Sequence, residues 1–221
     1  MAEMQAVIFD VDGLLLDSEA VYRQSWTEAA ANQRFVLTHQ RYATFIGQRI
    51  PWCEEQLAGL AGGDFDLGAF RAAWRVRWRE IARQGVAPKP GARELVAALR
   101  AHRIPCAVAT SSARPEAELS LAAWMADFDA VVTGDQVVNG KPAPDIYLLA
   151  AKRLGIDPLR CLAMEDSANG ARAALGAGMT VIIVPDLVEP PEEVASRALC
   201  VLPSLVAAHA EVLRQLGIDQ K

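Results

Sequence analysis

Carboxylates, hydroxyls and a lysine follow several short apolar runs of this chain, or lie in the loop between two of them. The residues are Asp10, Asp12, Thr110, Ser111, Ser112, Lys141, Glu165 and Asp166. Clustered carboxylates repel one another unless a cation lies among them, and an oxygen-rich site with a phosphate partner suits Mg²⁺. If the fold brings these side chains together, they predict a site of phosphoryl transfer.

The elements that must position these residues can be read from hydropathy. Apolar runs of four or five residues predict strands at Ala6–Phe9, Pro105–Ala109, Ala130–Thr133, Cys161–Met164 and Thr180–Val184, with a weaker one at Ala198–Leu202. Their continuous apolar character is typical of strands covered on both faces. Helical patterns separate them, at Gly91–His102, Pro115–Trp124, Asp145–Leu154 and Ala168–Gly176. This alternation predicts a Rossmann-like, doubly wound parallel α/β sheet, whose ligands bind at the carboxyl ends of the strands.

One long segment interrupts the alternation. Between the first strand and the next helix the sequence shows only helical patterns, at Glu19–Gln33, Pro51–Ala61 and Phe65–Gln84. We therefore expect a core domain of residues 1-17 and 86-221 and an inserted, all-helical cap domain of residues 18-85. Leu14–Ser18 and Gly85–Gly91, the second with two prolines, would be the linkers between them.

Four motifs in chain order carry a resemblance to a known family. They are Asp10-x-Asp12-Gly13 with the following Leu14-Leu15-Leu16-Asp17-Ser18-Glu19, then Thr110, then Lys141-Pro142-x-Pro144-Asp145, and Glu165-Asp166-Ser167-x-Asn169-Gly170. With these motifs the sequence resembles the haloacid dehalogenase superfamily, subfamily I. Within it the chain is similar to the phosphatases and mutases that have a helical cap after the first strand, typified by β-phosphoglucomutase. The resemblance spans nearly the whole chain.

The resemblance implies a role for each residue of the first motif. Asp10 would be the nucleophile, forming an aspartyl-phosphate that splits one difficult displacement into two easier ones. Asp12 would protonate the leaving oxygen and then deprotonate the hydrolytic water. Gly13 would let the chain leave the strand sharply beside the substrate.

The other motifs would hold the phosphoryl group and a metal ion. Thr110 would donate its hydroxyl to a phosphoryl oxygen, helped by free N–H groups of Ser111 and Ser112 at the start of the next helix. Lys141 would supply a fixed positive charge. The metal, Mg²⁺, would be bound by Asp10, by Asp12 through its backbone carbonyl, and by Asp166. Glu165 would either support these ligands or replace one of them.

Each assignment has a plainer alternative. Asp12 could close an Asx turn, Thr110 and Asp166 could cap helices, and Lys141 could be a solvated loop residue. Their joint occurrence after successive strands favours the chemical interpretation. Dehalogenation is disfavoured because a halide leaves without the acid that Asp12 provides. A binding protein without catalysis would be expected to lack Asp10 or Asp166.

The closer alternative is a β-phosphoglucomutase-type phosphosugar mutase. Those mutases have the pattern DGxxxDTxxxH, whereas this chain has Ser18 in place of the threonine and Tyr22 in place of the histidine. The substrate expected is therefore a small phosphomonoester, a sugar phosphate, that the enzyme hydrolyses. The cap would select it, with Arg49 as the candidate substrate contact or else a surface arginine. Trp74 and Trp78 are expected to pack inside the cap.

Composition excludes other classes of function. The 221 residues carry 22 Lys+Arg and 27 Asp+Glu, a net charge of −5 without a basic block, which disfavours a nucleic-acid partner. Four isolated cysteines form no zinc motif. There is no apolar segment of membrane-spanning length and no signal-peptide pattern, so we expect no membrane association and a cytoplasmic location. We also expect a monomer whose only partner is a small phosphorylated metabolite.

Overall fold

The structure is a computed structural model of the chain and describes residues 3–45 and 50–218. It divides into two compact units. Unit 1 consists of Met1–Asp17 and Ala87–Lys221, and unit 2 is the segment Ser18–Val86 between them. Each unit has its own buried core.

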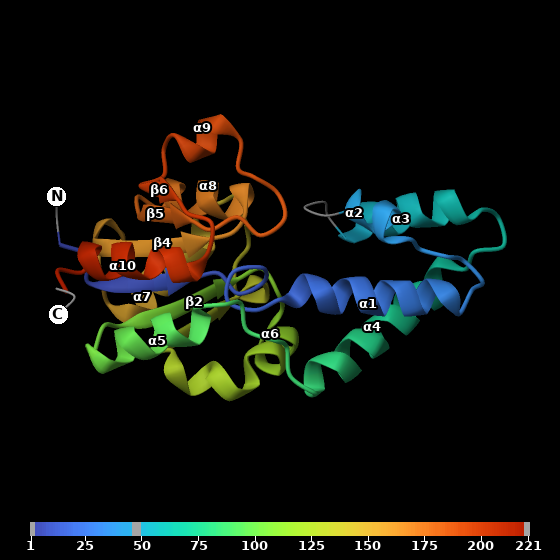
Figure 1. Ribbon diagram of the computed structural model, residues 1–221, viewed down its shortest axis with the longest axis horizontal. Helices are drawn as coiled ribbons and strands as arrows, with labels where there is room; N and C mark the ends of the chain where they lie inside the picture. The colour runs from blue at the N-terminus through green and yellow to red at the C-terminus, as the bar shows by residue number, and fades with distance from the viewer. Residues whose placement is uncertain (1–2, 46–49, 219–221) are drawn as a thin grey trace. The chain divides into compact units, whose positions relative to one another are not determined.

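Unit 1 is built on a six-stranded parallel sheet with the strand order β3-β2-β1-β4-β5-β6 (Figure 1). The strands are β1 Ala6–Phe9, β2 Cys106–Thr110, β3 Ala130–Thr133, β4 Cys161–Glu165, β5 Thr180–Ile183 and β6 Cys200–Val201. All six predicted strands are present, and the order places β1 at the centre between β2 and β4. The residues of β1 are fully buried, as expected for a strand covered on both faces.

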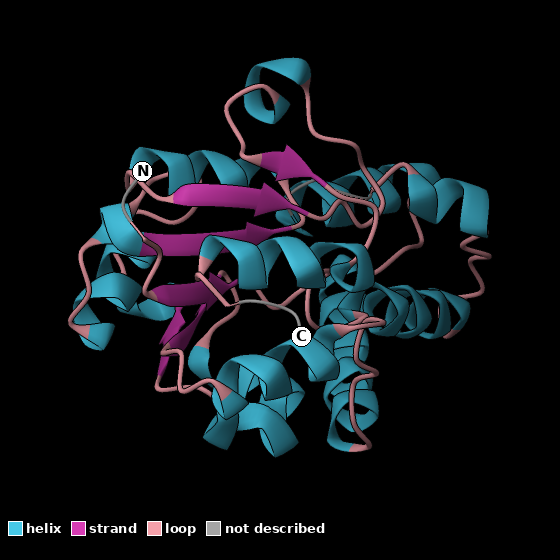
Figure 2. Cartoon of the chain, turned by 60° about the vertical axis from the view of Figure 1, so that its left-hand side comes forward, coloured by secondary structure: helices cyan, strands magenta, loops and turns pink. Residues whose placement is uncertain are grey.

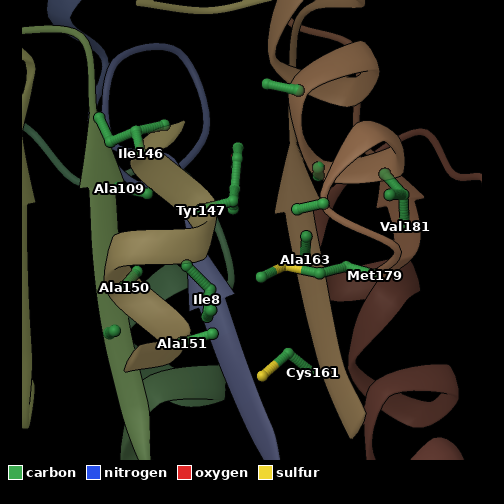
Figure 3. Close-up of a cluster of buried hydrophobic side chains, with 14 of the residues drawn as sticks. Ile8, Ala109, Ile146, Tyr147, Ala150, Ala151, Cys161, Ala163, Met179 and Val181 are labelled. Carbon is green, nitrogen blue, oxygen red and sulfur yellow. The ribbon is translucent and has the colours of Figure 1, made fainter. Parts of the chain in front are cut away.

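Helices cover both faces of the sheet (Figure 2). They are α5 Ala92–Ala101, α6 Arg114–Leu121, α7 Asp145–Leu154, α8 Ala168–Gly176, α9 Glu192–Ala195 and α10 Leu205–Gln215, with short 3-10 helices η1 Ala122–Asp127, η2 Gly134–Gln136 and η3 Pro158–Arg160. α7 and α8 pack against each other on one face, and α5 packs against β2 and α10. Figure 3 shows the α7 face, where Ile146, Tyr147 and Ala150 meet buried side chains of the sheet. The predicted doubly wound α/β fold is confirmed.

The chain leaves β1 through a turn that belongs to the core. Leu14, Leu15 and Leu16 are buried, and the amides of Leu15 and Leu16 both donate to the carbonyl of Val11. The returning segment pairs with this turn, because Lys89 N–H donates to the Leu15 carbonyl at 2.9 Å. Both predicted linkers are therefore partly fixed to unit 1.

Unit 2 is entirely helical in its described part, with α1 Ser18–Ala31, α2 His39–Ala43, α3 Ile50–Ala61 and α4 Leu67–Arg83. α1 packs along α4, and α3 also contacts α4. Trp26 lies among other aromatic rings, with the Phe70 ring 5.3 Å away and perpendicular to it. Asp66 begins α4 by accepting the amide of Ala69 at 3.0 Å. An aromatic core therefore holds these helices together.

Several elements differ from the prediction. The helix expected over Pro115–Trp124 begins at Arg114 and changes at Ala122 into the 3-10 helix η1. The helices α2, α9 and α10 had no predicted counterpart. Among the described residues, no helix combines the length and apolar character needed to cross a membrane.

Candidate active site

Three polar residues lie where β1, β2 and β4 end. Asp10 follows β1, while Thr110 and Glu165 are the last residues of β2 and β4. Because Phe9 pairs with Met164, Asp10 and Glu165 lie side by side. Strand order reverses beside β1, which is where open parallel sheets bind their ligands. Asp10 is only 5% exposed and the other two are fully buried, so their charges and hydroxyls require partners inside the protein.

Lys141 reaches this edge from the loop before α7 and joins the two carboxylates. Its Nζ lies 2.5 Å from Asp10 Oδ1 and 2.5 Å from Glu165 Oε1. Burial lowers the pKa of Lys141, but the two carboxylates outweigh burial and raise this pKa above its ordinary value. The loop is fixed at its end, where Asn139 donates to Asp145 at 3.0 Å. Lys141 is therefore a buried, permanently charged group held against Asp10.

Glu165 uses both carboxylate oxygens within the protein. Tyr147 donates its hydroxyl to Oε1 at 2.7 Å, and Ser167 donates its hydroxyl to Oε2 at 3.0 Å and its amide at 3.2 Å. A Cβ on Gly170 would lie 1.8 Å from Oε1, so the first turn of α8 can approach the carboxylate only with glycine. Because both Glu165 oxygens already have partners, among them Lys141, we favour Asp166 over Glu165 as a metal ligand.

Asp12 is held by hydroxyls at the end of β2. Its Oδ2 accepts from Thr110 Oγ1 at 3.1 Å and from Ser112 Oγ at 2.8 Å. The Ser112 amide donates to Thr110 Oγ1 at 3.0 Å, and α6 begins only at Arg114. The expectation of a free Ser112 N–H at a helix start is therefore wrong, because the chain makes a side-chain turn before the helix. Ser111 is exposed beside it.

Asp10 combines burial with an incomplete set of partners. Burial is the main cause that raises its pKa, to about 7; Lys141 opposes this effect, while Glu165 and Asp12 add to it. Its Oδ2 is buried and has no hydrogen-bond partner among the described residues. Such an atom is costly unless a ligand or cation completes its environment.

Asp166 follows Glu165 and faces the turn after Asp12. Its Oδ2 lies 2.4 Å from the position that a Cβ on Gly13 would take, and Gly13 has φ +86°, so glycine is required there for both space and conformation. Burial first, then the charges of Asp10 and Glu165, raise the pKa of Asp166 well above its ordinary value. The excess of buried negative charge and the free oxygen of Asp10 fit a hard cation.

Side chains alone would not make a complete metal site here. In the part of the chain that the structure describes, no three His, Cys, Asp or Glu side chains gather closely enough to hold a metal ion. The Asp12 carboxylate is turned to Thr110 and Ser112. Asp10 and Asp166, with the Asp12 carbonyl that the resemblance implies, remain the groups predicted to hold Mg²⁺.

The candidate substrate contact Arg49, in the segment Gly47–Ile50, lies outside the described residues. Trp74 and Trp78 are buried in unit 2, as predicted. The ring of Tyr22, at the position where the mutases have histidine, packs 5.7 Å from that of Trp78.

Sequence reasoning missed three further residues. Tyr147 supports Glu165, Glu54 is buried in unit 2 between Arg71 and Trp74, and Asp186 lies near Asp166. Tyr147 and Glu54 lie on helices, Tyr147 within an apolar stripe, and Asp186 lies in a loop, so no motif marks them. Only the sheet topology, which brings the ends of β4 and β5 together, could have drawn attention to Asp186.

Comparison with known proteins identifies the family. The family model of haloacid dehalogenase-like hydrolases matches residues 4–178. The chain is 36% identical over 218 residues to "Probable pseudouridine-5'-phosphatase" of Drosophila melanogaster, covering 90% of this chain and 88% of that protein. It is 34% identical over 182 residues to fructose-1-phosphate phosphatase YqaB of Escherichia coli, covering 80% and 95%.

A solved structure agrees over the full length. The HAD family hydrolase of Deinococcus radiodurans R1, crystallised with bound phosphate and sodium, matches with a TM-score of 0.83 and 31% identity, covering 100% of both chains. The chain therefore belongs to the haloacid dehalogenase-like hydrolases and is a phosphoric monoester hydrolase of that family.

Proposed function

We propose that this enzyme is an Mg²⁺-dependent phosphatase that hydrolyses a small sugar phosphate through an aspartyl-phosphate on Asp10. The observation that carries the proposal is the buried Asp10, with one oxygen held by Lys141 and the other without a partner among the described residues. The free Oδ2 could bind the cation, and Oδ1, which lies beside Lys141, could attack phosphorus. Bound Mg²⁺ would neutralise phosphoryl charge and keep Asp10 ionised.

The remaining residues have distinct tasks in this reaction. Lys141, fixed by Glu165, would stabilise charge that develops on the phosphoryl oxygens. Thr110 and Ser112 now donate to Asp12, so phosphoryl oxygens would compete with Asp12 for these donors. Asp12 would give its proton to the departing oxygen and then accept one from the attacking water. Water, not a second sugar hydroxyl, would take the phosphate.

The choice of a sugar phosphate rests on the relatives. Fructose 1-phosphate, in the name of one, is a phosphorylated sugar, and the name of the other specifies a phosphorylated nucleoside. Unit 2, including Arg49, would act as the cap that selects among such esters. We propose that the protein acts as a cytoplasmic monomer on this small metabolite, which size-exclusion chromatography with light scattering would test for the oligomeric state.

A phosphate-release assay tests the proposal. Hexose phosphates, pentose phosphates and nucleotides would be offered with Mg²⁺ to the wild type and to Asp10→Asn, with EDTA as a second control. We expect release from sugar phosphates that both controls abolish. If no compound releases phosphate and β-glucose 1-phosphate is converted to glucose 6-phosphate, the enzyme is the mutase despite Tyr22.

A further inference from the structure

A fifth carboxylate, Asp186, lies at the same edge of the sheet, near Asp166. It follows β5, whose residue Ile183 pairs with Glu165. Asp186 Oδ2 lies 3.2 Å from the position that a Cβ on Gly13 would take, and Asp166 Oδ2 lies 2.4 Å from the same position. The two carboxylates therefore face one small volume beside the Gly13 turn. In agreement, Asp186 is among the charges that raise the pKa of Asp166.

Asp186 is paired with Lys89, which comes from the segment that returns from unit 2 to the core. Lys89 Nζ donates to Asp186 Oδ1, and the side chains are only 26% and 11% exposed. Lys89 is fixed in place because its amide donates to the Leu15 carbonyl, next to the Gly13 turn. The pair thus contributes a negative charge that faces Asp166 and a positive charge on the other side of the Asp186 carboxylate.

An ion pair on an open surface has little effect on its surroundings because water screens it. This pair is largely shielded. No hydrogen bond or ion pair of the described residues joins Asp186 to Asp10, Asp12 or Lys141, so we assign it no step of phosphoryl transfer. Its charges do lie where they act on a cation held by Asp10 and Asp166. The Asp186 carboxylate attracts that cation, and the Lys89 ammonium repels it.

We propose that Asp186 and Lys89 are positioning residues that set the affinity of the site for Mg²⁺ in opposite directions. The inference rests on the proposed function, since it assumes that Asp10 and Asp166 bind the cation. Asp186 strengthens binding through its charge, without joining the ligands, and Lys89 limits that effect. Together they would make Mg²⁺ binding tight enough for catalysis and still reversible.

The test is a titration with Mg²⁺ alone, without substrate. The thermal unfolding midpoint would be followed against MgCl₂ concentration at pH 7.5 and constant ionic strength for the wild type, Asp186→Asn and Lys89→Gln. We expect Asp186→Asn to need about fivefold more Mg²⁺ for half the shift, and Lys89→Gln about fivefold less. Higher ionic strength should reduce both differences. Glu193→Gln, which removes one carboxylate from the exposed pair with Arg172, is the control and should leave the titration unchanged.

The opposite signs separate an electrostatic effect from structural damage. Either substitution breaks the ion pair, so structural damage alone would change the Mg²⁺ affinity of both variants in the same direction. Changes in the same direction, or changes smaller than twofold, would overturn the inference. If Asp186→Asn does not fold, Lys89→Gln decides alone, because a weaker or unchanged affinity contradicts the proposal. A wild type that does not respond to Mg²⁺ would instead contradict the cofactor of the proposed function, and the inference with it.

Discussion

The hydroxyl of Tyr147 lies at the far end of a chain of contacts that leads through Glu165 and Lys141 to Asp10. The Lys141 ammonium also lies 5.1 Å from the centre of the Tyr147 ring. Tyr147→Phe keeps the ring and removes the hydroxyl. We expect kcat to fall about tenfold with KM unchanged, because Glu165 would hold Lys141 less firmly. Steady-state kinetics would measure both constants.

A stability measurement separates this effect from general loosening of α7. Losing a hydrogen bond to a buried carboxylate should lower the free energy of unfolding by about 2 kcal/mol. Arg153→Met is the matched control, because Arg153 also lies on α7 and donates to the Val131 carbonyl at 2.7 Å, away from Glu165. It should reduce stability without lowering kcat. Equal kcat in Tyr147→Phe and the wild type would show that Lys141 does not depend on this hydroxyl.

The raised pKa of Asp10 makes stability depend on pH. Burial raises this pKa to about 7, whereas an unfolded aspartate titrates near 3.8. Between these values the folded state holds a proton that the unfolded state has lost. In EDTA, raising the pH from about 4 to 7 should therefore lower this residue's contribution to the free energy of unfolding, by an amount of the order of a few kcal/mol.

Asp10→Asn isolates that contribution, since asparagine has nearly the same shape and does not titrate. Urea denaturation in EDTA at pH 5, 6 and 7.5 would give the free energy of unfolding of both proteins. The wild type should lose stability relative to Asp10→Asn as the pH rises, because only the wild type must ionise a buried carboxylate. Parallel curves over this range would argue against the raised pKa.

The sequence located the groups of this site, and the structure supplied their partners. Asp10, Lys141 and Glu165 could be placed together because each follows a strand or precedes the next one. The bond between Tyr147 and Glu165 could not be predicted, because Tyr147 reads as one more apolar position of a helix. The turn at Ser112, closed by the Thr110 hydroxyl, could not be predicted either, because a hydroxyl that closes a turn leaves no periodic pattern in the sequence.

At the scale of elements, the approach of α8 to the end of β4 depends on one glycine. Alanine at Gly170 would place a Cβ 1.8 Å from Glu165 Oε1. Within a helix, Gly→Ala is normally favourable by about 0.5–1 kcal/mol. Here we expect the opposite sign, a loss of more than about 2 kcal/mol with a large fall in kcat, because Glu165 must move away from Lys141.

Gly59 provides the matched helical control. It lies within α3, where a Cβ would meet nothing within 4 Å. Gly59→Ala should raise the free energy of unfolding of unit 2 by about 0.5–1 kcal/mol and leave kcat unchanged. Chemical denaturation of both variants gives the two signs. If Gly170→Ala were also stabilising, the contact between α8 and Glu165 would not constrain the site.

The elements that the sequence predicts well are those whose burial leaves a clear hydrophobic pattern. The bounds of β1, β3, α7 and α8 match the predicted ranges because continuous apolar runs and clear helix starts define them. α10 was not predicted, although Ser204 marks its start by accepting the Ala207 amide. Neither glycine nor proline marks the change from α6 to the 3-10 helix η1 at Ala122.

At the scale of the whole molecule, each unit has a buried core of its own. Four of the five tryptophans, Trp26, Trp52, Trp74 and Trp78, belong to unit 2, so fluorescence reports mainly on that unit. Inside it, Glu54 is 1% exposed and accepts from Trp74 Nε1 at 3.0 Å and from Arg71 Nε at 2.7 Å. Removing this carboxylate would leave both donors in unit 2 without their acceptor.

We expect Glu54→Ala to lower the fluorescence-detected unfolding midpoint, at a cost of about 3 kcal/mol, and to leave a later transition of the α/β unit unchanged in far-UV circular dichroism. Gly170→Ala should instead lower the transition of the α/β unit and leave the fluorescence-detected midpoint unchanged. Two separable transitions would mean that the helical unit can accept substitutions that retune its contacts without weakening the sheet that holds Asp10 and Lys141. One transition, moved alike by both substitutions, would instead mean that the units share their stability, so that any change in the helical unit also affects the catalytic edge.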